Sequence, residues 1–176
     1  MATHKNLSEL FTAIADAIRE KTGSTDPIVA DDFPEAILAI QTGPSGPFTV
    51  LITADNIQNY FTVTNSSYYF KGSGTVFTTN NYHESSTTAK TVLTAKFDMD
   101  VSFTYSYSSE SRWDTFTLTV GSTTVVNEAS GSTTSSQYSG SIIAGTTITF
   151  TYSKDSSSHS NDDECTFSNM MVTGYF

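Results

Sequence analysis

Alternation of apolar and hydroxyl side chains, sustained through most of the chain after residue 48, constrains the fold more than any other feature. In the run TVLTAKFDMDVSFTYSYSS, residues 91–109, the apolar Val101, Phe103, Tyr105 and Tyr107 alternate with Ser and Thr. Successive side chains of a β-strand point to opposite faces, so this run predicts a strand with one buried and one polar face. The chain after residue 48 is therefore predicted to be mainly β.

Shorter runs repeat the pattern along the rest of this region. Two of them place three inward residues each, namely Phe116, Leu118 and Val120 in DTFTLTVGS, and Ile148, Phe150 and Tyr152 in TTITFTYS. A Gly121-Ser122 turn predicts a hairpin between two of the strands. About eight to ten short strands at such spacing predict an antiparallel, jelly-roll-like β-sandwich, with an up-and-down barrel as the lesser alternative.

The first 40 residues follow a helical period instead. A single apolar stripe runs through Leu7, Leu10, Phe11, Ile14, Ala17 and Ile18, which predicts a helix over about residues 6–21 that stops at Gly23. A second helix is predicted to start near Asp32, because Asp32 and Glu35 have the spacing of a capping box. It continues through Phe33, Ile37 and Ile40.

The segment QTGPSGP, residues 41–47, separates the two patterns and is predicted to be a linker. The expected organisation is a two-helix module over residues 1–40, the linker, and a β-sandwich over residues 48–176. The helical module is too small to fold alone without a staple, a metal or a partner. Its apolar stripes either dock on the sandwich of the same chain or serve attachment and oligomerisation, through Leu7, Leu10, Phe11, Ile14, Ile18, Phe33, Ile37 and Ile40.

Charge and composition exclude several classes of partner. The chain carries a net charge of -10 from 18 acidic and 8 basic residues. Nucleic acid and anionic membrane surfaces both need clustered Lys and Arg, and none is present. No apolar run is long enough to insert in a membrane, and the N-terminus has no secretory signal pattern. We therefore expect synthesis in a bacterial cytoplasm without export.

No motif in the sequence predicts an enzyme. The three histidines, His4, His83 and His159, stand in polar stretches without the context that activates a serine. Cys165 is the single cysteine, so neither an intrachain disulfide nor a cysteine metal site can form, and it is expected to be a small buried apolar residue. A pair of carboxylates acting on a glycosidic bond is the one enzymatic alternative.

Two acidic loops are candidates for a structural Ca²⁺ ion, and no other cofactor is predicted. Calcium prefers six to eight oxygen ligands, which these loops could supply through Glu110, Asp114, Asp155, Asp162 and Asp163. The spacing does not match an EF-hand, and surface turns are commonly built from Ser, Asn and Asp. Plain turns are therefore the alternative interpretation.

A second group of residues is a candidate for glycan binding. Trp113, the only tryptophan, stands beside Arg112 between two acids, and such a ring could stack on a sugar while its neighbours bind the hydroxyls. Tyr82 and Tyr138 are further candidates. The alternative for Trp113 is that it anchors an edge of the sandwich.

The N-terminal run also resembles a known module. LFTAIADAIREKTGSTDPIVADDFPEAILAI, residues 10–40, is similar to a module of the form IADAIRxKTGxTDxIxxxDFPxxI, which recurs near the start of structural proteins of bacteriophages and prophages of Gram-positive gut bacteria. The matching residues are Ile14-Ala15-Asp16-Ala17-Ile18-Arg19, Lys21-Thr22-Gly23, Thr25-Asp26 and Phe33-Pro34-Glu35. More loosely, residues 107–118 and 144–163 look like β-sandwich modules of phage appendages and bacterial surface proteins.

The resemblance implies a virion protein of the tail, fibre, head-appendage or decoration type. Its partners would be other virion proteins and sister chains, with a trimer as the preferred assembly. The displayed sandwich would adhere weakly to cell-surface or mucin glycans. The alternatives are a connector without a ligand, and a bacterial surface adhesin or carbohydrate-binding module of prophage origin.

Overall fold

The computed structural model of this chain describes residues 7–22, 25, 47–156 and 163–175. The chain divides into two compact units, one of Met1–Pro47 with Tyr175–Phe176 and one of Phe48–Gly174. Within the described residues, the structure contains no helix with the length and apolarity needed to cross a membrane.

The first unit contains helix α1, Leu7–Thr22, which confirms the first predicted helix. Ala15 and Ile18 are buried, whereas Phe11 is 39% exposed and Ile14 is partly buried. Asp16 and Arg19 form an ion pair one turn apart on the helix surface. The predicted second helix, with Phe33, Ile37 and Ile40, lies outside the described residues, as does most of the predicted linker.

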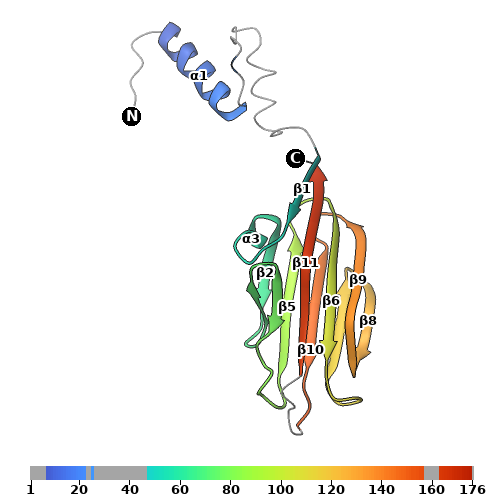
Figure 1. Cartoon of the computed structure of the whole chain (residues 1–176). Coiled ribbons are helices and arrows are strands. Elements are labelled where there is room, and N and C mark those ends of the chain that lie inside the picture. The colour runs from blue at the N-terminus through green and yellow to red at the C-terminus, as the bar shows by residue number, and fades with distance from the viewer. Residues whose placement is uncertain (1–6, 23–24, 26–46, 157–162, 176) are drawn as a thin grey trace. The chain divides into compact units, whose positions relative to one another are not determined.

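The second unit is a sandwich of two sheets (Figure 1). One sheet contains β1 (Pro47–Leu51), β3 (Phe70–Ser73), β4 (Val76–Thr79), β6 (Met99–Ser108), β9 (Ser132–Ile142) and β11 (Glu164–Tyr175). The other contains β2 (Phe61–Asn65), β5 (Thr88–Ala95), β7 (Thr115–Val120), β8 (Thr123–Ala129) and β10 (Thr147–Ser153). A single helical turn, α3 (Ile57–Tyr60), precedes β2.

The strand order is that of a jelly roll. The sheets run β3-β4-β11-β6-β9, with β1 on β11, and β2-β5-β10-β7-β8. Four antiparallel pairs are nested around the β7–β8 hairpin: β7 with β8, β6 with β9, β5 with β10, and β4 with β11. One long antiparallel ribbon has thus been rolled so that its pairs fall alternately in the two sheets. The predicted fold class is confirmed.

Rolling the ribbon collects the connections at two ends. The β4–β5, β6–β7 and β8–β9 connections and the described ends of the β10–β11 connection lie together at the lower end in Figure 1, which we call the loop end. The shorter β5–β6, β7–β8 and β9–β10 turns lie at the opposite end, which we call the turn end. Residues from four distant parts of the sequence therefore meet at the loop end.

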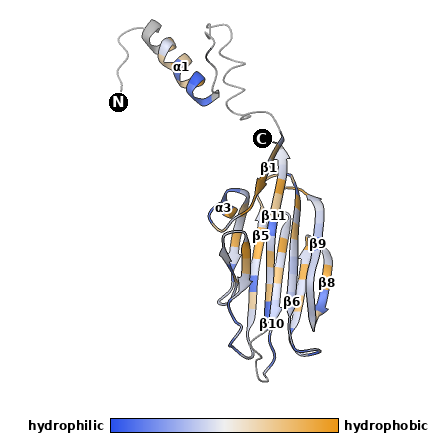
Figure 2. Cartoon of the chain, in the orientation of Figure 1, coloured by the Kyte–Doolittle hydropathy of each residue, from blue (hydrophilic) through white to orange (hydrophobic). Residues whose placement is uncertain are grey.

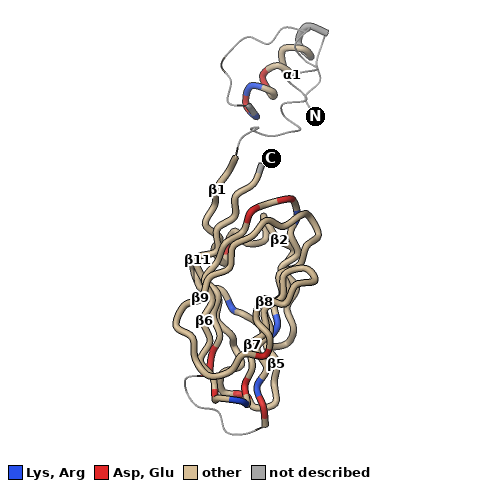
Figure 3. The backbone as a smooth tube through the Cα atoms, turned by 90° about the vertical axis from the view of Figure 1, so that its right-hand side faces the viewer, with Lys and Arg blue, Asp and Glu red and all other residues tan. Residues whose placement is uncertain are grey.

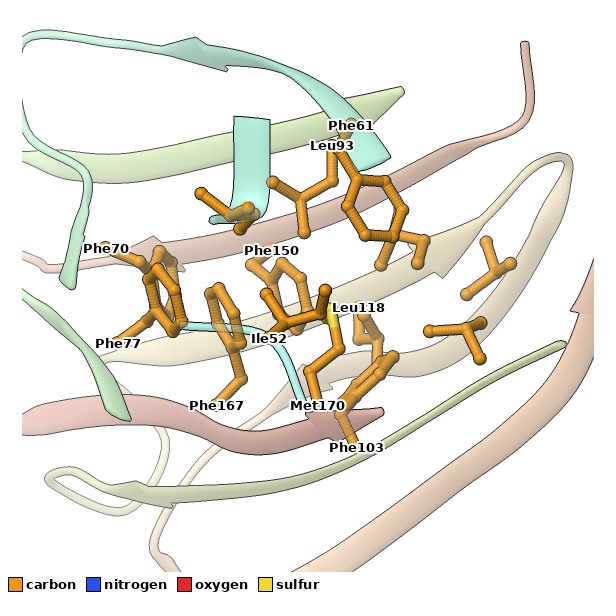
Figure 4. Packing of buried hydrophobic residues seen from close by; sticks show 14 of the residues in the cluster. Ile52, Phe61, Phe70, Phe77, Leu93, Phe103, Leu118, Phe150, Phe167 and Met170 are labelled. Atoms are coloured by element: carbon orange, nitrogen blue, oxygen red, sulfur yellow. The ribbon is translucent and has the colours of Figure 1, made fainter. Parts of the chain in front are cut away.

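Aromatic side chains fill the space between the sheets. Phe150 and Phe167 stack with ring centroids 4.1 Å apart, and Phe77 stacks on the same Phe167 at 4.5 Å (Figure 4). Apolar and polar residues alternate along the strands in Figure 2, as the sequence predicts for a sheet with one buried face. Burying such rings dominates the stability of the sandwich.

The inward residues predicted from the sequence are confirmed, except that two tyrosines are less buried than the others. Each of the following is buried: Val101, Phe103, Phe116, Leu118, Val120, Ile148, Phe150 and Tyr152, together with the cysteine, Cys165. Tyr105 and Tyr107 are only partly buried, and both pack on Phe116 with centroids 5.7 Å away. The register of β6 against β9 shifts between these two tyrosines, and such a bulge redirects side chains.

Candidate binding surface at the loop end

Three charged side chains are buried together at the loop end. Lys154 follows β10, Asp163 precedes β11 and Asp114 precedes β7, and their side chains are 2%, 1% and 4% exposed. The Lys154 ammonium donates to Asp163 Oδ2 at 3.2 Å and to the Tyr82 carbonyl oxygen at 2.9 Å. Asp114 Oδ2 is 3.9 Å from the same nitrogen. One buried lysine therefore connects three of the four loops.

Asp114 has the less favourable electrostatic position of the two acids. Its Oδ1 accepts a hydrogen bond from the Asp155 amide at 2.9 Å. Burial is nevertheless the largest influence and raises the pKa of the Asp114 carboxyl above its usual value. Burial also raises the pKa of the neighbouring Tyr152 phenol, with the nearby Asp114 charge as the next cause. The Tyr152 hydroxyl donates to the Ser108 carbonyl oxygen at 3.2 Å.

The β6–β7 loop is fixed to the β8–β9 turn by hydrogen bonds. The Ser109 amide donates to the Gly131 carbonyl oxygen at 2.8 Å, and the Gly131 amide donates to Ser109 Oγ at 3.0 Å. Further along the loop, the Arg112 amide donates to Ser130 Oγ at 2.9 Å. Arg112 has a φ of 82°, a backbone region that disfavours any residue with a Cβ. The surrounding bonds hold the loop in this strained conformation.

Two aromatic side chains are exposed above this buried network. Trp113 is 61% exposed, and it directly precedes the buried Asp114. Tyr82 is 45% exposed, and its ring lies 3.9 Å from that of His83. The interpretation of Trp113 as an anchor of the sandwich edge does not fit this exposure. The backbone of both aromatic segments is held near the same buried lysine, so two exposed rings share one end of the domain.

A shallow groove adjoins Tyr82 on the outer face of the β3–β4 edge. Its volume is about 320 Å³, and it is lined by Lys71, Gly72, Ser73, Val76, Thr78, Thr79, Asn80 and Tyr82. In the β3–β4 pairing, Lys71 lies opposite Thr78 and Ser73 lies opposite Val76. The groove therefore offers an ammonium group, hydroxyls and one aromatic wall, which are the groups that hydrogen-bond and stack on sugars.

The fold brings together three of the four predicted glycan-binding residues. Arg112, Trp113 and Tyr82 all lie at the loop end. Tyr138 does not, because it belongs to β9 and its ring stacks on Phe103 with centroids 5.2 Å apart. It lines a different cavity of about 360 Å³ at the turn end, beside Gly121, Ile142 and Ile143.

The predicted calcium ligands are placed less consistently. Asp114 and Asp163 approach each other, but the Lys154 ammonium lies where their two carboxylates would share a cation. Glu110 and Asp155 belong to the same end of the sandwich, and Asp162 lies outside the described residues. No group of three or more acidic, His or Cys side chains suited to a metal occurs within the described ranges. A calcium site involving Asp162 stays a prediction.

The burial of Lys154 was not predicted from the sequence, although a signal for it existed. It continues the inward alternation of Phe150 and Tyr152 beyond the end of the strand. Asp114 precedes inward Phe116, and Asp163 precedes inward Cys165, at the same two-residue spacing. Asn81 continues Phe77 and Thr79 in this way and is fully buried. A polar residue two positions beyond the last inward residue of a strand thus indicates a member of the buried network. Figure 3 shows charged residues of both signs at this end.

Comparisons with known proteins identify likenesses of fold. Neither a family model nor a curated protein sequence matches this chain. The secreted serine protease VesC from Vibrio cholerae superposes with a TM-score of 0.53 at 13% identity, over 72% of this chain and 28% of that protein. An adhesin domain of Lys-gingipain from Porphyromonas gingivalis gives a TM-score of 0.42 at 12% identity, over 73% of this chain and 99% of that domain. A CBM35 domain from Paenibacillus barcinonensis gives 0.30 at 12% identity, over 73% of this chain and 98% of that domain.

These similarities concern the fold and give no information on a functional site. This chain spans 28% of the length of VesC, so the match concerns one part of that protein. At 13% identity the superposition on VesC reflects the shared arrangement of strands and not a shared site. By this comparison and by its own topology, the described β-region of the chain is a β-sandwich domain.

Proposed function

We propose that this chain is an adhesion module whose loop end binds glycans on a bacterial or mucosal surface. The observation that carries the proposal is the 61% exposed Trp113, which stands on a loop held in place by the Ser109–Gly131 and Asp114 contacts. An exposed aromatic ring on a rigid support stacks on a sugar with little loss of conformational entropy.

Charge and shape support a neutral or cationic glycan in preference to an anionic polymer. The chain carries a net charge of -10, which repels polyanions over the distance of a Debye length. Arg112 is exposed and precedes Trp113 in the sequence, and the exposed Lys71 lines the groove together with Tyr82. Each can donate hydrogen bonds to sugar hydroxyls, and the shallow groove suits weak binding that is strengthened by many copies.

Binding of this kind is tested with the chain immobilised at high density on beads. Trp113→Ala should weaken capture of the neutral or cationic array glycans that the native chain binds by about tenfold, equivalent to about 1.4 kcal/mol. Ile143→Ala is the matched control, because Ile143 is also exposed but belongs to the turn end. Equal binding by the native chain and both variants, or binding by none of them, would contradict the proposal.

The N-terminal unit would supply the attachment, as the resemblance of residues 10–40 to phage modules suggests. In this proposal the module joins the chain to sister chains in a virion, and the sandwich is displayed outward. Ile18 is only 3% exposed, so the exposed Phe11 and the partly buried Ile14 are the better probes of a contact with a partner. An adhesin attached to a bacterial surface is the second candidate.

Light scattering of the purified chain tests the attachment step. Ile14→Asp should reduce an oligomer to monomers and leave the melting of the sandwich unchanged, because a charge on the α1 stripe opposes its burial against a partner. A monomeric native chain, or loss of both the oligomer and the sandwich, would contradict this role.

A further inference from the structure

The buried network at the loop end places a nucleophile against an electrophile. Lys154 Nζ is 3.2 Å from Asp163 Oδ2, so the Asp163 carboxyl carbon is one bond further away. Groups held in contact by the fold react far faster than the same groups free in solution. Both side chains are at most 2% exposed, so bulk water is excluded from the site and condensation, which releases water, is less opposed there.

We propose that Lys154 and Asp163 condense spontaneously after folding to form an intramolecular amide bond. The Lys154 nitrogen attacks the Asp163 carboxyl carbon, a new C–N bond forms, and one C–O bond breaks. Overall, one ammonium and one carboxylate become one amide and one water molecule. No atom changes its oxidation state, so the reaction needs neither an oxidant nor an activated co-reactant. The inference is independent of glycan binding.

The first requirement of this reaction is a neutral amine facing a neutral carboxylic acid. Proton transfer from the ammonium to the carboxylate produces this pair. In water the charged pair is strongly favoured by hydration, whereas in a buried site hydration is lost and the neutral pair becomes accessible. Burial of both partners therefore supplies the condition that free lysine and aspartate lack.

Asp114 is placed to move the protons. Its Oδ2 is 3.9 Å from Lys154 Nζ, and its other oxygen is fixed by the Asp155 amide. As an acid it can donate a hydrogen bond to the Asp163 carbonyl and stabilise the charge that develops there during attack. It can then pass a proton to the departing hydroxyl. Burial raises the pKa of Asp114, which favours the protonated form that this role requires.

The bond would join the two sheets of the sandwich. Lys154 directly follows β10 in one sheet and Asp163 directly precedes β11 in the other. A covalent link across the β10–β11 loop restricts the unfolded chain and resists separation of the sheets at the loop end. An ordinary buried ion pair adds little net stability and so does not explain why three charged side chains are buried here. A cross-link formed from two of them would explain it.

Intact mass of the purified, denatured full chain tests the proposal directly. The expected mass is that of the sequence less one water molecule. Trypsin gives a second readout, because it does not cleave after a lysine whose side chain is an amide. An unreacted chain yields separate peptides 113–154 and 155–176, whereas the cross-linked chain yields one peptide 113–176 with the same water deficit.

Variants distinguish this bond from other losses of water. Lys154→Arg and Asp163→Ala should restore the full mass, whereas a cyclic imide formed elsewhere would persist in Lys154→Arg. Glu164→Gln is the matched control, because Glu164 is exposed beside Asp163, and it should retain the deficit. Asp114→Asn should slow bond formation by at least tenfold after refolding.

The native chain itself decides the outcome even where a variant fails to fold. A full sequence mass together with cleavage after Lys154 would overturn the proposal. A deficit that survives Lys154→Arg would overturn it as well. Bond formation that is as fast in Asp114→Asn as in the native chain would overturn the role of Asp114.

Discussion

The chain reverses direction at both ends of the sandwich, but different residue types form the reversals at each end. At the turn end, positive φ angles fall on glycines, Gly121 at 57° and Gly145 at 83°. At the loop end, Ser86 at 56° and Arg112 at 82° adopt them without that freedom, beside Gly131 at 84°. All three buried charged residues of the described chain, Asp114, Lys154 and Asp163, lie at the loop end.

The loop end therefore contains features that lower the stability of the fold, whereas the turn end does not. Glycine turns are the least strained way to reverse a chain, and the turn end uses them. Strained backbone and buried charge both oppose folding unless the surroundings compensate, and such features gather at functional sites. This contrast favours the loop end over the cavity beside Tyr138 as the site where the sandwich acts.

The largest expected effect comes from removing the central charge of the loop end. Lys154→Met should lower the free energy of unfolding by about 3–5 kcal/mol, because two buried carboxylates then face each other without a cation. If Lys154 is joined to Asp163 as an amide, Lys154→Met removes the cross-link and leaves Asp163 as an unpaired buried carboxylate, which is also destabilising. Lys90→Met, at an exposed lysine of β5, should change it by less than about 0.5 kcal/mol. Urea unfolding of the two variants measures the contrast, and equal stabilities would contradict it.

A second prediction concerns pH and Asp114. The pKa of Asp114 is raised by burial in the folded chain, against about 3.9 in the unfolded chain. Protonation therefore stabilises the fold: the contribution is complete below about pH 3.9 and is lost as pH rises through the raised folded pKa. The stability of the native chain minus that of Asp114→Asn should accordingly fall with rising pH across this window.

Urea unfolding at a series of pH values measures this difference, and the subtraction removes the titration of groups common to both chains. A difference that rises with pH would mean that the pKa of Asp114 is lowered in the folded chain.

The smallest effects concern the backbone of the two ends. Gly145→Ala should destabilise the sandwich by about 1–2 kcal/mol, because a Cβ is unfavourable at positive φ. Arg112→Gly should stabilise it by up to about 1 kcal/mol, since relief of the same strain exceeds the added entropy of glycine in the unfolded chain. Thermal melting detects both, and changes of the same sign would contradict the comparison.

Much of the sandwich could be predicted because the alternation of apolar and polar residues shows which side chains of a strand point inward. Phe116, Leu118 and Val120 alternate with threonines, and a strand can satisfy this pattern only by turning one face inward. The same parity continues to Asp114 before the strand, but a charged residue next to a turn is normally solvated, so its burial was not predicted. The glycan candidates Arg112, Trp113 and Tyr82 were recognised singly, by residue type.

The sequence by itself determined the periodicity of each segment, and therefore the α1 helix, the inward rows of the strands and the sandwich class, because these depend on neighbours a few residues apart. Only the tertiary structure decided which loops meet. The nesting of β4–β11, β5–β10 and β6–β9 around one hairpin brings Asp114, from the β6–β7 loop, to Lys154 and Asp163, at the two ends of the β10–β11 connection. Such proximity depends on strand pairing over long sequence separations, which no local pattern encodes.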